Sequence, residues 1–141
     1  MGWQFYNASG QRLSSVADKT ATQAEMEAAS STTAYVTPGR AQHHPGVVKA
    51  SVRIASAGTI ESNDYNVASI TDTATGNRTI VWDVDFDNEF YAVASTNSTN
   101  DSVFARHTTF SAGSVVLQVV NAANSALADS GTSTIAVGVQ V

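Results

Sequence analysis

A chain of 141 residues with seven basic and twelve acidic side chains has a net charge of −5, which argues against a nucleic-acid-binding protein, since such a protein needs a basic surface. The chain contains no cysteine, so disulfides and thiolate chemistry are excluded. Only 13% of the residues are charged, against about 25% in an ordinary globular protein, and this polar but weakly charged composition is typical of extracellular β proteins and virion shells.

The first 13 residues predict a short strand and a turn, with the turn at residues 7–10. They lack the charged and apolar regions of a signal peptide, so none is expected. Along the whole sequence, no apolar run approaches the ~20 residues that a membrane span needs. Trp3, Phe5 and Tyr6 are too apolar to be left in water. They either pack on the chain's own domain or anchor the chain on a neighbouring protein.

A helix of about two turns is expected next. Thr22 and Glu25 have the spacing of a capping box, and residues 23–29 are mostly good helix formers. A helix this short is not stable by itself in water, so it must dock on something. Residues 30–46 then predict an extended connector, with a turn where Pro38 is followed by Gly39.

From Val47 onward the hydrophobic pattern changes to a period of two, which divides the chain into an N-terminal arm, 1–45, and a domain, 46–141. Seven short strands separated by turn residues predict an all-β fold, an antiparallel β-sandwich or jelly-roll-like domain. The strands are expected near 47–55, 65–71, 78–86, 90–96, 103–110, 114–121 and 133–141.

Alternation is clearest in the third strand, where one face is predicted to enter the core and to carry Ile80, Trp82, Val84 and Phe86. The last two strands are apolar on both faces, as in a strand that is covered on two sides or lies at a subunit interface. We therefore expect oligomerisation. The interface residues predicted from this pattern are Val116, Leu117, Val119, Ile135, Val137 and Val139.

An acidic ladder runs through residues 83–89 and begins like a calcium loop, but Asn88 and Ala94 stand where that loop needs glycine and glutamate. The carboxylates are most simply the solvent side of a strand. Asp83 and Asp85 remain weak candidates for a calcium or magnesium site, and a pair of glycosidase carboxylates is a remoter alternative.

Other catalytic constellations are missing. His43 and His44 are adjacent, so in an extended chain they point in opposite directions and do not share a metal easily, and His107 lies far away in the sequence. The chain has no Gly-x-Ser-x-Gly elbow, no phosphate-binding loop and no dinucleotide fingerprint. We expect no enzymatic activity and no cofactor.

The polar run 95–102 is the candidate recognition loop, because loops at the end of a sandwich often carry binding sites. Asn97, Asn100 and Asp101 would face a receptor, a surface glycan or protein. The alternative is a solvated hairpin loop, since no aromatic side chain lies within the run.

Four segments together carry a resemblance to a known family: Ala21–Glu27, Thr32–Arg40, His44–Ala50 and Asn66–Gly76. In this order they resemble tail-fibre and related structural proteins of tailed bacteriophages. The resemblance implies a virion structural protein on the exterior of the particle, a homotrimer that docks on other virion proteins. The docking residues would lie in the arm and comprise Trp3, Phe5, Tyr6, Tyr35 and Arg40.

Two roles remain open within this resemblance. The segment 21–40 favours a short fibre or fibre tip that meets the host surface, whereas the small size and the absence of a long shaft favour a decoration or cement protein of capsid or baseplate. A secreted carbohydrate-binding domain is a remoter alternative, disfavoured because no signal peptide is expected.

Overall fold

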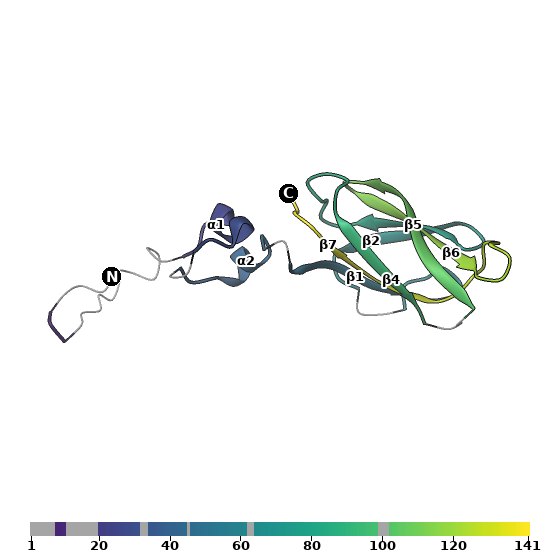
Figure 1. The fold of residues 1–141 in the computed structure, drawn as a ribbon, viewed down its shortest axis with the longest axis horizontal. Coiled ribbons are helices and arrows are strands. Elements are labelled where there is room, and N and C mark those ends of the chain that lie inside the picture. The colour runs from purple at the N-terminus through teal and green to yellow at the C-terminus, as the bar shows by residue number, and fades with distance from the viewer. Residues whose placement is uncertain (1–7, 11–19, 32–33, 45, 62–63, 99–101) are drawn as a thin grey trace. The chain divides into compact units, whose positions relative to one another are not determined.

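The computed structural model describes residues 8–10, 20–31, 34–44, 46–61, 64–98 and 102–141 (Figure 1). Contacts within the chain divide it into two compact units, Met1–Pro45 and Gly46–Val141. No helix in the described ranges is long and apolar enough to cross a membrane.

The N-terminal unit contains the helix that the sequence predicts. Helix α1 spans Gln23–Ala28, and its capping box is complete. The Thr22 hydroxyl accepts the backbone N–H of Glu25 at 3.2 Å, and the Glu25 carboxylate accepts the backbone N–H of Thr22 at 2.8 Å. The helix ends at Ala29, whose positive φ of 48° lets its N–H bond back to the last carbonyls.

The connector differs from the prediction, because a one-turn helix, α2, spans Pro38–Ala41 where a simple turn was expected. Pro38 occupies its first turn, where proline is favoured because its fixed φ suits a helix and its missing N–H has no partner to lose. Tyr35 pairs in parallel with Thr20 through an isolated bridge, so the segment ahead of α2 is tied to the segment ahead of α1.

The second unit is an all-β sandwich of two antiparallel sheets (Figure 1). The three-stranded sheet has the order β1-β7-β4 and the four-stranded sheet the order β2-β3-β6-β5. The strands are β1 Val48–Ile54, β2 Val67–Ala74, β3 Asn77–Trp82, β4 Ala92–Asn97, β5 Val103–Ser111, β6 Ser114–Asn121 and β7 Thr132–Val137.

The core lies between the two sheets and is centred on aromatic residues. Trp82 and Phe86 are 3% and 1% exposed, which confirms their predicted place in the core. Tyr91 stacks on Phe86 with ring centroids 4.0 Å apart and accepts the indole N–H of Trp82 at 3.0 Å. Gly138 covers this pair so closely that a Cβ there would come within 2.7 Å of Tyr91 Cβ.

The third strand ends earlier than predicted. β3 stops at Trp82, and Val84, expected in the core, is 46% exposed. The Asn66 side chain bonds to both the N–H and the C=O of Val84, at 2.5 and 3.1 Å, and so replaces the sheet ladder there. Phe86 returns to the core two residues later by pairing with Gln140 near the end of the chain.

The opposite end of the sandwich is closed by a buried arginine. Arg78 is 0% exposed, and its guanidinium donates to the carbonyls of Ser130 at 2.8 Å and Ser56 at 2.6 Å. Asp129 lies 3.7 Å from the same guanidinium and also accepts the N–H of Gly76. One side chain thus joins β3 to the loops that precede β2 and β7.

Candidate interaction surfaces

The N-terminal unit exposes apolar side chains around a shallow hollow. Tyr35 and Val36 are 56% and 53% exposed, and Arg40 is half-buried. The hollow has a volume of about 220 Å³ and is lined by Ala21, Glu25, Met26, Ala29, Ser31, Ala34, Val36 and His44. Because most of this lining is apolar, the hollow suits an apolar side chain of a partner.

The hollow also contains one carboxylate, that of Glu25, which is ionised at neutral pH. The pKa of Glu25 is lowered by the hydrogen bonds from the backbone and side chain of Thr22, so its carboxylate stays ionised at neutral pH. Of the five predicted docking residues, Tyr35 and Arg40 belong to this unit's described part. Trp3, Phe5 and Tyr6 lie outside the described residues.

The outer side of the three-stranded sheet is apolar and nearly uncharged. Along β4 and β7, outward and inward residues alternate strictly, and the outward positions carry small or aliphatic side chains. We call this surface the apolar sheet face; its outward residues are Val48, Ser51, Arg53, Tyr65, Ala92, Ala94, Thr96, Ser133, Ile135 and Val137. Ile135 at its centre is 44% exposed.

The outer side of the four-stranded sheet mixes polar residues with Phe104, which is 47% exposed, and the half-buried Val81. Thr71 and Thr79 are register partners on it, and Arg106 donates to Gln118 at 2.9 Å across the β5–β6 pair. Val116 is a half-buried aliphatic residue among them. A surface of this composition is compatible with water.

The prediction of a subunit interface is wrong for two of its six residues. Leu117 and Val119 are fully buried in the domain's own core, on the inner side of β6, so no second subunit can reach them. Val120, on the outer side, is 1% exposed because it lies between its register partners Phe104 and Leu127. The chain itself therefore covers much of the second apolar side of β6. Val116, Ile135, Val137 and Val139 keep partial exposure.

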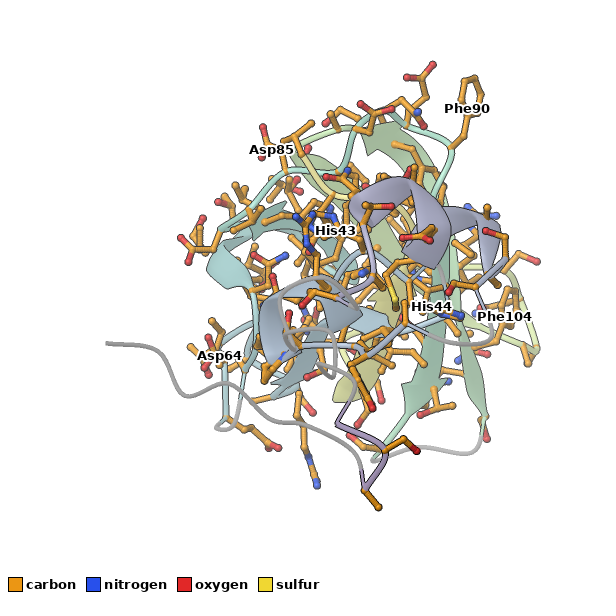
Figure 2. The ribbon with its side chains drawn as sticks, turned by 90° about the vertical axis from the view of Figure 1, so that its left-hand side faces the viewer. His43, His44, Asp64, Asp85, Phe90 and Phe104 are labelled. Atoms are coloured by element: carbon orange, nitrogen blue, oxygen red, sulfur yellow. The ribbon has the colours of Figure 1, made fainter. Side chains whose placement is uncertain are left out.

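The acidic segment 83–89 lies at the surface. Asp83 and Asp85 are exposed, and none of the four carboxylates of this segment forms an ion pair within the described part of the chain. No group of three or more metal-ligating side chains occurs among the described residues. Beside this segment the Phe90 ring is 86% exposed and projects into solvent, as Figure 2 shows.

The predicted recognition loop loses one of its three residues. Asn97 is the last residue of β4 and lies on the inner side of the sheet, where its side-chain amide donates to the carbonyl of Val103 and its Oδ1 is buried. It cannot face a receptor. Asn100 and Asp101 lie outside the described residues.

A serine and a histidine meet between the sheets, which is the closest approach to catalytic geometry in the described residues. Ser95 Oγ lies 2.9 Å from His107 Nε2 and 2.6 Å from Thr134 Oγ1. Burial lowers the pKa of His107, which favours the neutral imidazole. No hydrogen bond or ion pair links His107 to a carboxylate in the described part of the chain, so the third group of a catalytic triad is missing there.

Several exposed residues were missed by sequence reasoning. Val36, Tyr65 and Phe90 looked like ordinary apolar positions, since a single sequence does not tell an exposed aromatic from a buried one. For Phe90 a local signal existed: Asn88 two residues earlier forms a turn by accepting its N–H at 2.9 Å, as Asn commonly does.

No protein-family model, curated protein or solved structure matches this chain.

Proposed function

We propose that the chain is a non-enzymatic virion structural protein of a tailed bacteriophage, a short homotrimeric tail-fibre or fibre-tip protein. Its N-terminal unit attaches it to the particle, and its β-sandwich faces outward and contacts the host surface. The proposal combines the sequence resemblance of four ordered segments with the surfaces described above.

The exposed apolar surface of the N-terminal unit is the observation that supports attachment most directly. A unit of 45 residues buries little of its surface, so it gains little stability alone. It nevertheless leaves Tyr35 and Val36 more than half exposed beside an apolar hollow. Covering these residues with a virion protein would stabilise the unit and hold the chain on the particle.

A capsid or baseplate decoration protein is the second candidate. It is favoured by the apolar sheet face, because a domain that lies flat on a shell would cover such a surface. The two roles differ in copy number and place: a fibre protein occurs a few times at the tail, and a decoration protein many times over a shell.

The test uses particles that lack the protein, reconstituted with the purified full-length chain and imaged by electron cryomicroscopy. Density at the tail would support the fibre, density spread over the head or baseplate would support decoration, and no density at all would overturn both.

Two variants locate the attachment surface in the same assay. Val36→Asp places a charge beside the hollow and should abolish particle binding. Phe104→Asp changes a residue of similar exposure, 47%, on the sandwich and should bind normally. If Val36→Asp binds at full occupancy, the N-terminal unit is not the anchor.

A further inference from the structure

The two outer faces of the sandwich differ in what they offer to a partner. The face of the four-stranded sheet carries threonine, glutamine and arginine beside Phe104, which is 47% exposed, and Val116, so charged and polar groups interrupt its apolar side chains. On the apolar sheet face, neither β4 nor β7 contributes a charged residue, and Ile135 lies between Ser51 and Ala94 as register partners. Small neighbours leave the Ile135 side chain accessible, so another surface can approach it closely.

The charge distribution limits which partner fits. The sandwich unit holds nine of the acidic and four of the basic residues, so it carries the whole net charge of −5. Four of those carboxylates lie in segment 83–89, Asp72 lies against Gly58, and Asp129 lies beside Arg78. On the apolar sheet face Arg53 and Glu61 neutralise each other, and the exposed Asp64 precedes Tyr65 at the edge of the face.

This distribution favours a second copy of the same chain over a charged partner. Two molecules of the same strong negative charge repel each other unless they meet through a surface that carries no net charge. A basic partner, conversely, would gain no attraction from this face and would bind the acidic segment instead.

We propose that copies of this chain associate through the apolar sheet face, with three copies turning that face toward a common axis and Ile135 meeting its own equivalents there. The inference deepens the homotrimer of the proposed function and rests on it. It moves the interface away from Val116 and from the buried residues of β6.

The area of the apolar sheet face sets the expected strength of association between copies. Three strands about 4.8 Å apart and six residues long at ~3.3 Å per residue cover roughly 300 Å², less than the ~800 Å² that one partner contributes to a standard interface. Each copy in a trimer meets two neighbours, and Tyr65, which is 48% exposed, extends the face. The association should therefore depend on concentration.

The experiment measures the mass of the full-length chain by sedimentation equilibrium over the micromolar range. Wild type should approach three times the protomer mass of 14.7 kDa as concentration rises. Ile135→Lys puts three like charges at the axis and should weaken association by at least about tenfold, while Ile135→Leu should not. The matched control is Val116→Lys on the other sheet, which should associate as wild type does. Near-ultraviolet circular dichroism confirms that every variant is folded.

Each of the other possible results of this experiment would overturn a particular part of the proposal. A trimer that persists in Ile135→Lys overturns this interface and leaves the trimer intact. Dissociation by Val116→Lys alone assigns the interface to the four-stranded sheet. A dimeric wild type overturns the three-copy arrangement. A wild type that stays monomeric throughout overturns the homotrimer as well, whereas attachment to particles is judged separately by the Val36→Asp assay.

Discussion

Arg78 shows how a single residue can close one end of the sandwich. Its planar guanidinium presents donors in a fixed fork, and two of them reach carbonyls of two different loops, at Ser130 and Ser56. Arg78→Met keeps an unbranched apolar stem but removes the guanidinium, so both carbonyls lose that donor. We expect a loss of about 2–4 kcal/mol in the free energy of unfolding, measured by urea denaturation with circular dichroism.

The control for this prediction is Arg106→Met, because Arg106 is exposed and its partner is the Gln118 side chain. A surface change of this kind should cost less than about 0.5 kcal/mol. Equal effects of the two substitutions would show that the buried fork contributes nothing specific.

Replacing Lys49 is expected to increase the stability of the fold rather than decrease it. It lies at a β-bulge in β1 and is 1% exposed, and its Nζ has no hydrogen-bond partner among the residues that the structure describes. Burial lowers its pKa from the ordinary 10.5 because the charged form is poorly solvated. Lys49→Met removes the buried amine and should raise the midpoint of thermal unfolding. In wild type, stability should rise with pH as the ordinary pKa is approached, and that rise should shrink in the variant.

We expect His107 to make the stability of the sandwich unit depend on pH in mild acid. Burial lowers its pKa below 6.5, so the unfolded chain binds a proton more readily than the folded one. The free energy of unfolding should therefore be highest above pH 6.5, fall as the pH drops below it, and level off below the folded pKa. Within the described residues, Ser95 and the Phe110 ring face the imidazole.

His107→Gln should flatten this slope between pH 7 and 5.5, whereas His43→Gln, in the other unit, should leave it unchanged. Thermal unfolding followed by circular dichroism across this range gives the comparison. An identical slope in wild type and His107→Gln would remove the histidine from the explanation.

At the scale of elements, α1 depends on its cap more than on its length. Thr22→Ala removes the hydroxyl that accepts the Glu25 N–H, and loss of such a cap costs about 0.5–2 kcal/mol. Amide hydrogen exchange measured by NMR should speed up at residues 23–28. Exchange in β3 and β6 should not change, because those strands belong to the other unit. Faster exchange throughout both units would mean that they unfold together.

The strands were predictable from sequence because alternation is a local signal. The strand expected at 114–121 is β6, and the one expected at 103–110 is β5 less its last residue. The predicted third strand ran too far because Val84 continues the alternation in sequence while Asn66, a distant residue, takes its backbone bonds. A long-range contact of this kind leaves no trace in the strand that it ends.

The surfaces were less predictable than the strands. Periodicity shows that a strand has two apolar sides but not which side the chain covers, so Leu117 and Ile135 were assigned to one interface although one is buried and the other exposed. Charged residues gave the opposite error. Arg78 and Lys49 would be expected at the surface, because charged side chains are rarely buried, but both lie in the interior. For Arg78 the deciding contacts come from Ser56 and Ser130, which lie far away in sequence.

At the scale of the whole molecule, the core of the sandwich should be sufficient for folding without the N-terminal unit. All eleven residues of the buried core cluster, from Ala50 to Ala136, belong to Gly46–Val141. The Arg78 closure and the hydrogen bond from Trp82 to Tyr91 lie within the same range. A chain of residues 46–141 should therefore give the near-ultraviolet circular dichroism of a packed Trp82 and unfold cooperatively, within a few degrees of the full-length protein. A molten or unfolded 46–141 chain would show that the N-terminal unit is part of the fold and does more than attach it. If 46–141 folds but no longer binds the particles, the anchor lies in residues 1–45, as we propose.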